Sequence, residues 1–463
     1  MLKKIFALLF LFTLYSISGY GQNISHYEKI VNTTPDKQKK LTALDSLLKR
    51  TYSKDTDAFI KYSLQYIDLA QELDSIELAA KKAMNLQYPL TNYANDPLNA
   101  ITVINSVLAR KYKIEDSLLL GGLYMKRGSA NTKVDLKRAI EDYNVALENF
   151  SSKDSMNIAD TYLFRGQAYS QMGKFVLAGE DFTRAYTLYE LKQEYDYMVY
   201  AQQGIISMFS MNGFHQKAKI ERDALIEKMK SLGLNRFLSY EYYNQALDYK
   251  KMGNRDLEHK ALLMAEKSFE RDNSNKSTYI GIHSRLIEYY CEQNQIIEAK
   301  KHLDQLEALD FDLSGNPPAE LNFLGGKAKY LQTIGNYEVA LALAKKKLEI
   351  AKSLGMEDEI MGTYSFLSEI YYDMGEYKKS IENNQASAAI KDSIYNRSTA
   401  NALAYYQTLY ETEKKEKELV EKTTSISLLE KDNESFKKAM LFGGIAILLG
   451  FGLILLYRNQ RHL

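Results

Sequence analysis

The chain has 463 residues, 45% of them hydrophobic, and its 60 lysines and arginines almost balance its 59 aspartates and glutamates. Nucleic-acid binding normally requires a concentrated basic surface, and this balance argues against it. The single cysteine and five prolines exclude a disulfide framework and a proline-rich linker. The composition therefore predicts a protein with enough apolar residues for a large continuous core and with no nucleic-acid partner.

Residues 1–21 are organised like a secretory signal peptide. Two lysines precede the mostly apolar run 5–17, and the sequence at 19–21 follows the small-x-small pattern of a cleavage site. Cleavage is favoured over a retained anchor because the run is shorter than a membrane span and no cysteine follows it to take a lipid. We expect cleavage before Gln22 and export of the rest of the chain.

Residues 22–157 carry a weaker form of a repeat of about 40 residues that becomes regular further along the chain. Ala100 and Ala139 lie where the second helix of a repeat is expected to carry a small residue. An earlier helix pair is predicted at 38–51 and 57–73. Terminal repeats are expected to be irregular, because one of their faces meets water instead of a neighbour.

Residues 158–395 contain the regular part of the pattern, which returns six times. Its fixed point is a glycine, or once an asparagine, and successive copies lie 40, 40, 41, 41 and 40 residues apart. In chain order these residues are Gly173, Gly213, Gly253, Asn294, Gly335 and Gly375. A fixed period of this length is typical of stacked repeat proteins. We therefore predict an all-α solenoid of eight or nine helix-turn-helix units.

One unit, residues 159–191, carries the clearest lettering. In chain order its pattern residues are Tyr162, Gly166, Tyr169, Gly173, Phe175, Ala178, Phe182 and Ala185. The glycine at 173 accepts the left-handed conformation that ends a helix, and the small residues let two helices approach closely. These residues resemble the tetratricopeptide repeat at the corresponding positions. The period exceeds the family's usual length of about 34, which we attribute to longer helices or longer inter-repeat loops.

The resemblance implies that the first helix of each pair lines a concave groove. Projected onto this chain, that implication gives a set of candidate binding residues. They are Tyr200, Gln203, Ser207, Tyr240, Tyr243, Lys250, Ser284, Glu288 and Tyr372. Tyrosines with mixed polar neighbours suit an extended peptide or another protein. The alternative is that several of these side chains pack against the next repeat.

No residue pattern predicts catalysis, a cofactor or a metal site. The six histidines are scattered singly, without a His-Glu-x-x-His helix, and the one cysteine has no Cys-x-x-Cys partner. His283 and Cys291 share one predicted helix, and ordinary core packing is the simpler interpretation of both. The glycine pair Gly325-Gly326 lacks the lysine and hydroxyl of a phosphate loop. We expect neither enzymatic activity nor a small-molecule substrate.

Residues 396–438 predict a long charged helix. Four glutamates in this segment precede a lysine by four residues, a spacing that stabilises helices. A row of apolar residues follows one seam: Leu419, Ile426, Leu429, Phe436 and Met440. Two interpretations stay open, a short coiled coil that joins two copies as a homodimer through 401–457, or a single solvated helix.

Residues 439–457 form a run of 19 residues without a charge. At about 1.5 Å per residue, a helix of this length spans about 30 Å, the thickness of bilayer hydrocarbon. The sequence therefore predicts a transmembrane helix with 458–463 as a cytoplasmic tail. Because the N-terminal part is expected to be exported, we expect a single-pass protein of a bacterial inner membrane with periplasmic repeats.

The predicted order of signal peptide, repeats, charged helix and single span resembles the sensory half of bacterial histidine kinases and helix-turn-helix regulators. The most similar part is 389–463, and no output domain follows it. The first hypothesis is a non-enzymatic, membrane-anchored sensor or adaptor that binds a protein or peptide. One alternative is a static scaffold for a membrane or envelope assembly. Another is the sensor part of a kinase or transcription regulator whose output domain is missing.

Overall fold

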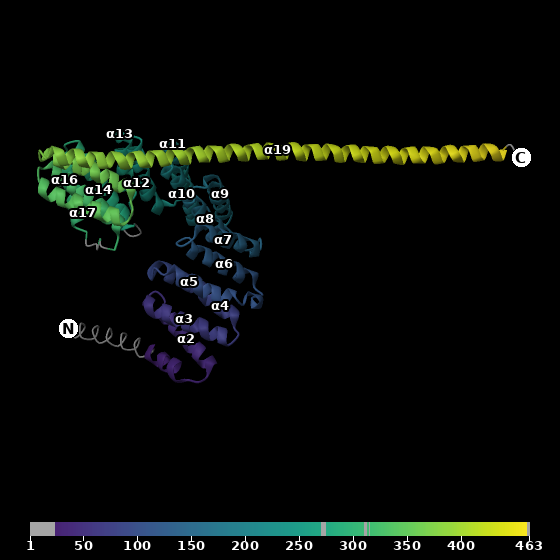
Figure 1. Cartoon of the computed structure of the whole chain (residues 1–463), viewed down its shortest axis with the longest axis horizontal. Coiled ribbons are helices and arrows are strands. Elements are labelled where there is room, and N and C mark those ends of the chain that lie inside the picture. Colours follow the sequence, from purple (N-terminus) through teal and green to yellow (C-terminus); the bar gives the residue numbers. More distant parts are fainter. Residues whose placement is uncertain (1–23, 270–274, 310–312, 314, 461–463) are drawn as a thin grey trace. The chain divides into compact units, whose positions relative to one another are not determined.

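The computed structural model describes residues 24–269, 275–309, 313 and 315–460, and every regular element in these ranges is a helix (Figure 1). The predicted signal peptide at 1–21 and the last three residues of the predicted tail, 461–463, lie outside the described residues. The chain divides into two units, residues 1–399 and 400–463. The all-α prediction is confirmed.

The helices of the first unit follow one another as pairs, and α19 begins as the second member of the last pair. Their bounds are α2 Lys37–Thr51, α3 Thr56–Glu72, α4 Ile76–Tyr88, α5 Pro97–Leu108, α6 Ser117–Asn131, α7 Leu136–Asn149, α8 Ser155–Gln171, α9 Phe175–Leu191, α10 Tyr195–Met211, α11 His215–Ser231, α12 Asn235–Lys251, α13 Arg255–Lys267, α14 Lys276–Glu292, α15 Ile296–Glu307, α16 Pro317–Thr333, α17 Tyr337–Ser353, α18 Glu357–Asp373 and α19 Tyr377–Gln460. Residues 24–33 are also helical, a π-helical turn, Pro89–Tyr93, follows α4, and a 3-10 turn, Lys111–Lys113, follows α5.

Helix length sets the repeat period. The five consecutive helices from α8 to α12 have 17 residues each. The turns between them, such as 172–174 and 192–194, have only three residues. Two such helices and two such turns make a repeat of the predicted length. The excess over the tetratricopeptide period therefore comes from longer helices, and the inter-repeat loops stay short.

The residues predicted to end the first helices adopt the left-handed backbone conformation. The φ angle is +72° at Gly173, +57° at Asn294 and +81° at Gly335, and it is positive at the other three positions as well. After α8, the amide of Lys174 donates to the carbonyl of Tyr169 at 2.9 Å, the hydrogen bond that marks a Schellman motif. This part of the prediction is confirmed.

Glycine allows neighbouring pairs to pack closely around a buried aromatic ring. Phe182 on α9 is 1% exposed, and its ring lies against Gly166 of α8 and Gly204 of α10. A β-carbon would lie 2.9 Å from the ring at Gly166 and 2.8 Å from it at Gly204, closer than real contacts allow. The three helices can therefore meet at this depth only because both positions lack a side chain.

Buried arginines join successive helices in two equivalent arrangements, which we call the arginine clamps. The first clamp consists of Arg127, Asp142 and Asn105, and the second of Arg165, Asp181 and Asn144. In the second clamp, Nε and Nη2 of Arg165 donate to the two carboxylate oxygens of Asp181 at 2.7 and 2.8 Å. Nη1 of Arg165 donates to Asn144 Oδ1 at 2.6 Å. Each clamp thus ties together α5, α6 and α7, or α7, α8 and α9.

The start of α19 contacts both ends of the C-terminal part of the first unit. Arg397 forms an ion pair with Glu357, at the start of α18. Ser398 Oγ donates to the carbonyl oxygen of Asn212, in the turn after α10, at 2.9 Å. The first part of α19 therefore belongs to the packed array, although the charged helix is predicted to begin only at residue 396.

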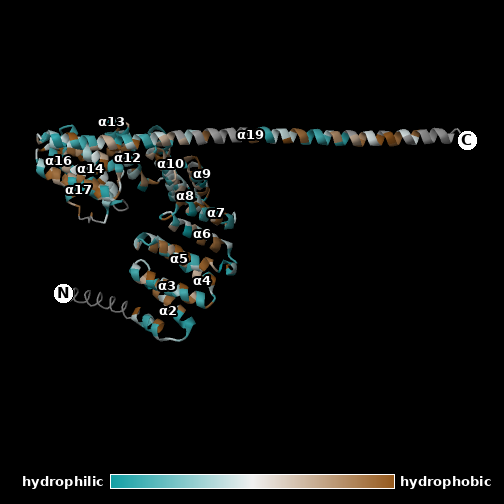
Figure 2. Ribbon diagram, in the orientation of Figure 1, coloured by the Kyte–Doolittle hydropathy of each residue, from teal (hydrophilic) through white to brown (hydrophobic). Residues whose placement is uncertain are grey.

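The second unit is the continuation of α19. Figure 2 shows polar and apolar residues mixed along its described part. The seam residues Leu419, Ile426, Leu429, Phe436 and Met440 are all exposed. Self-association through 401–457 stays a prediction.

In the part of the chain that the structure describes, no helix combines the length and the apolar character that a membrane crossing demands. This finding contradicts the predicted span at 439–457 and the single-pass inner-membrane location with periplasmic repeats that depended on it. A crossing takes about twenty consecutive, predominantly apolar residues. The prediction counted the absence of charge, whereas this segment includes Gly443, Gly444, Gly450 and Gly452, which contribute no side chain to an apolar surface.

Candidate functional site

The predicted binding residues lie on α10, α12, α14 and α18, and they fall into three environments. The first is an exposed aromatic surface. The side chains of Tyr200, Tyr240 and Tyr372 are exposed, and so is Ser207. The ring of Tyr200 lies 5.9 Å from that of Phe237, so α10 and α12 share one aromatic contact. These residues are available to a ligand.

The second environment is the interior of the helix packing. Gln203 donates to Glu241 Oε1 at 2.7 Å, and Glu241 is fully buried beside Arg222. Ser284 on α14 is also fully buried, and its backbone lies against Gly326 of α16. For Gln203 and Ser284 the alternative interpretation therefore fits better, because both pack against a neighbouring repeat.

The third environment brings Tyr243, Lys250 and Glu288 together. Three residues that are not among those predicted from the sequence complete the group. We call Tyr243, Lys250, Arg285, Glu288, Lys347 and Glu359 the ionic cluster. Its members come from α12, α14, α17 and α18. Three helix pairs and the first helix of a fourth therefore have to stack correctly for the cluster to form.

Charged pairs hold the ionic cluster together. Arg285 forms an ion pair with Glu288 one helical turn away, and Lys250 Nζ lies 3.6 Å from Glu288 Oε2. Lys347 Nζ lies 2.9 Å from Glu359 Oε2. Between these pairs lies Gly325, where a β-carbon would come within 3.0 Å of Lys347 Nζ and 3.4 Å of Glu288 Oε1. Glycine in mid-helix thus leaves space where the charged groups converge.

The charges of the ionic cluster perturb one another strongly. Burial favours a neutral Glu288, but the positive charges of Arg285, Lys250 and Lys347 outweigh it and lower the pKa of Glu288 to about 2. Burial lowers the pKa of Lys250, although its side chain is 41% exposed. Burial, opposed by Arg285, raises the pKa of Tyr243 to about 12. The cluster is therefore surrounded by protein and still open to water.

One donor of the ionic cluster is unused. The Nε atom of Arg285 is buried and makes no hydrogen bond among the described residues. A buried donor without a partner costs about 1–3 kcal/mol, so such atoms are rare and demand an explanation. An oxygen of a bound ligand would supply the missing acceptor. In the sequence, the signal for this site is the glycine pair Gly325-Gly326 inside a helix, not the tyrosines.

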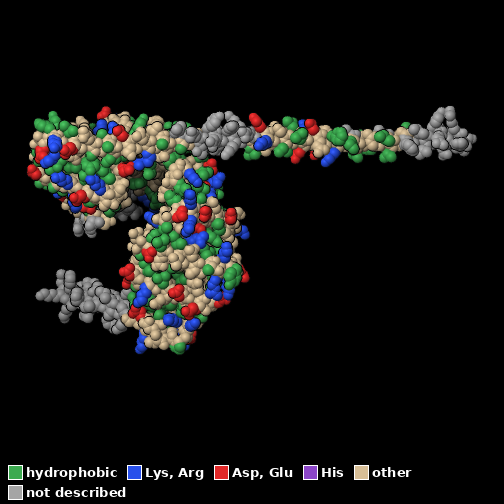
Figure 3. All heavy atoms as spheres, viewed as in Figure 1, with side chains coloured by type: hydrophobic (Ala, Val, Ile, Leu, Met, Phe, Trp, Pro, Cys, Tyr) green, Lys and Arg blue, Asp and Glu red, His purple; other side chains and the backbone are tan. Residues whose placement is uncertain are grey.

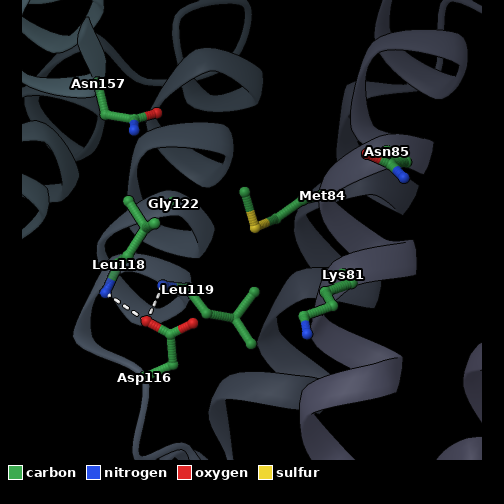
Figure 4. Close-up of a pocket in the computed structure, with 8 residues that line it drawn as sticks. All are labelled: Lys81, Met84, Asn85, Asp116, Leu118, Leu119, Gly122 and Asn157. Atoms are coloured by element: carbon green, nitrogen blue, oxygen red, sulfur yellow. Dashed lines mark hydrogen bonds between the residues drawn. The ribbon is translucent and has the colours of Figure 1, made fainter. Parts of the chain in front are cut away.

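A second concave feature lies between α4 and α6, with α8 contributing to its wall (Figure 4). This cavity has a volume of about 440 Å³ and is lined by Lys81, Met84, Asn85, Asp116, Leu118, Leu119, Gly122 and Asn157. The Asp116 carboxylate caps α6 by accepting hydrogen bonds from the amides of Leu118 and Leu119 at 2.9 and 3.3 Å. Because its carboxylate is committed to the helix end, the cavity has fewer free polar groups than the ionic cluster.

The surface charge agrees with the composition. Figure 3 shows positive and negative side chains interspersed over the visible face of the first unit, without a broad patch of one sign. Such a face offers no steering field for a polyanion.

No protein-family model matches this sequence, and a search of curated proteins finds no similar chain. Solved structures resemble it in fold. The apo form of RapI aligns with a TM-score of 0.55 and 14% identity over 81% of this chain and 98% of its own. The apo quorum sensor NprR from B. thuringiensis gives 0.48 and 13% over 81% and 99%. A tetratricopeptide repeat protein from Parabacteroides merdae gives 0.37 and 15% over 67% and 99%.

At such identities the likeness concerns the fold alone. Together with the helix pairs and their turns, it identifies the first unit as a tetratricopeptide-like helical solenoid.

Proposed function

We propose that this chain is a non-enzymatic binding protein that holds an extended peptide segment over the first helices α12, α14 and α16. The ionic cluster is the anchor of this site, and the exposed tyrosines of α10 and α12 flank it. The observation that carries the proposal is the buried, unpartnered Nε of Arg285 inside a water-accessible group of charges.

The ligand class follows from the chemistry of this donor. An arginine fork recognises oxygen acceptors, and an extended peptide presents main-chain carbonyls and carboxylates at close intervals. Lys250, also in the cluster, retains exposure for a second contact. A peptide therefore offers the acceptors that the cluster lacks.

Aromatic side chains supply the apolar part of the proposed site. Phe237, Tyr240 and Tyr243 follow each other at three-residue steps on α12, so they lie near one face of this helix. Tyr200 extends the row to α10 through its ring contact with Phe237. Tyrosine gives large contact area at small entropic cost, which is why it is common where proteins bind peptides.

A sensor or adaptor role requires that binding be passed on, and the start of α19 is suited to this. Through Arg397 and Ser398 it contacts α18 and the turn after α10. A peptide that changes the stacking of α12, α14 and α16 would alter the relation between these two contacts. The helix then continues into the second unit without a break.

The proposal can be tested with a random peptide library displayed on phage and selected on the full-length chain. We expect enriched peptides to bind Arg285→Ala at least about tenfold more weakly, because a hydrogen bond that involves a charged group contributes about 1.5–3 kcal/mol. Arg184→Ala removes an exposed arginine on α9 and is the matched control, with unchanged binding expected. Failure to enrich any peptide, or equal binding to both variants, would overturn the proposal.

A further inference from the structure

Two histidines and a glutamate from three consecutive helices converge outside the ionic cluster. His283 on α14 and His302 on α15 are 1% and 4% exposed, and their Nδ1 atoms lie 2.8 Å apart. Glu266 on α13 places Oε1 3.8 Å from Nδ1 of His302. One potential ligand atom from each residue thus lies within 4.8 Å of the other two. We call these residues the histidine cluster.

Both imidazoles are in the state that metal ions require. Burial lowers the pKa of His302, and burial together with the neighbouring His302 lowers that of His283 to about 3. Neutral imidazoles carry a lone pair on one ring nitrogen. Without an ion, the two rings can share only a single hydrogen bond between their Nδ1 atoms.

The spacing of the donor atoms is close to that of a zinc site. Zinc takes imidazole nitrogen at about 2.0–2.1 Å and carboxylate oxygen at about 2.0–2.2 Å in tetrahedral geometry, which places two ligand atoms about 3.4 Å apart. The histidine cluster would have to open by only a few tenths of an ångström at one edge and close by about as much at the other. Glu266 is 34% exposed, so an ion can enter from the solvent side.

Groups around the histidine cluster fix the rings and offer a further acceptor. Tyr290 stacks on His302 with an interplanar angle of 6°, and Tyr279 packs on His283 with the ring centroids 4.1 Å apart. The side-chain oxygen of Gln305 is buried without a hydrogen bond of acceptable geometry, yet it lies near enough to His302 to raise its pKa against the effect of burial. A metal-bound imidazole needs such an acceptor for its second nitrogen.

We propose that Glu266, His283 and His302 bind a divalent transition-metal ion, with Zn²⁺ as the expected occupant, and leave one coordination position to water. The residues lie 17 and 19 positions apart with one on each helix, so no local sequence motif reveals them. A bound ion would tie α13, α14 and α15 together. Because α14 also carries Arg285 and Glu288, the ion would stiffen the helix at the centre of the ionic cluster.

The test uses the full-length chain, stripped with a chelator and titrated with Zn²⁺ against a chromophoric competitor. We expect one ion per chain, X-ray absorption typical of two imidazoles with oxygen ligands, and a rise of the unfolding temperature with zinc. His302→Gln should weaken binding by at least about ten- to a hundredfold, the loss seen when even outer partners of a metal are removed. His259→Gln is the matched control, since His259 stacks on Tyr289 outside the cluster, and it should bind zinc like the wild type.

Glu266→Gln guards against a folding defect, because this side chain lies at the solvent edge and its replacement keeps the shape. It should weaken zinc binding while leaving the helical circular dichroism unchanged. Absence of a stoichiometric ion, or equal zinc affinity of the wild type, His302→Gln and Glu266→Gln, would overturn the proposal and leave the two histidines as a packed hydrogen-bonded pair.

Discussion

The arginine clamps and the ionic cluster use the same kinds of residue to different ends. In the second clamp, Arg165 donates from Nε, Nη1 and Nη2, and its partner Asp181 is almost fully buried. In the ionic cluster, Arg285 is paired with Glu288 while its Nε has no partner. A buried arginine with every group satisfied holds helices together. One with a donor left over is prepared for something that is not part of the chain.

The two regions also differ in how much of the fold they need. A clamp is completed within one helix pair and the helix before it, whereas the ionic cluster draws on residues from Tyr243 to Glu359. Damage to a clamp should therefore reduce stability locally, and damage to the cluster should reduce binding. The following predictions separate these two effects.

The largest expected loss of stability comes from the packing that supports the second clamp. Phe182→Ala empties the space between Gly166 and Gly204, and it should lower the free energy of unfolding by about 3–5 kcal/mol. Urea denaturation followed by circular dichroism measures this loss. A loss below about 1 kcal/mol would mean that the neighbouring helices collapse into the space.

Breaking the clamp itself should cost somewhat less. Asp181→Ala leaves the buried guanidinium of Arg165 without its main partner, and the free energy of unfolding should fall by about 3 kcal/mol. Glu180→Ala is the control on the same helix, because its ion pair with Arg184 is exposed and should contribute less than about 0.5 kcal/mol. Equal losses in the two variants would contradict the structural role of the clamp.

The ionic cluster should respond in the opposite way. Arg285→Lys keeps the positive charge and removes the fork, so the free energy of unfolding should change by about 1 kcal/mol or less. Affinity for the selected peptides, measured by fluorescence anisotropy, should fall about tenfold, which corresponds to about 1.4 kcal/mol. A variant that binds normally but unfolds easily would place Arg285 with the clamps.

The smallest effect is a dependence on pH. Because the folded protein lowers the pKa of Glu288 from 4.5 to about 2, its contribution to stability is complete above pH 4.5 and is lost as the pH falls towards 2. Glu288→Gln removes this contribution. Between pH 5 and pH 3, the wild type should therefore lose more stability than the variant, as measured by urea midpoints at each pH. Parallel losses would show that Glu288 is not held as a carboxylate by its neighbours.

The sequence carries the helical part of the fold because each turn needs a particular residue. Gly173 and Asn294 occupy left-handed positions, as their spacing predicts. The clamps also leave a sequence signal, since Arg127 and Arg165 lie 38 residues apart and Asp142 and Asp181 lie 39 apart. This second periodicity in polar residues is as regular as the first and is detectable without a structure.

The candidate site is harder to predict for a physical reason. Tyr243 and Glu288 are on the predicted face, but Lys347 lies on a second helix and reaches the cluster only because Gly325 leaves room for it. Such a contact depends on the angle between helices, which the repeat pattern does not specify. The predicted span fails differently, because the absence of charge was taken as equivalent to a continuous apolar surface.

The central claim is that a peptide lies over the ionic cluster, and photo-cross-linking tests it most directly. A selected peptide that carries a benzophenone group is irradiated with the full-length chain, and the modified residues are identified by mass spectrometry. We predict cross-links on α12, α14 and α16, close to Tyr243 and Arg285. Cross-links confined to the cavity between α4 and α6, for example at Met84, would contradict the account.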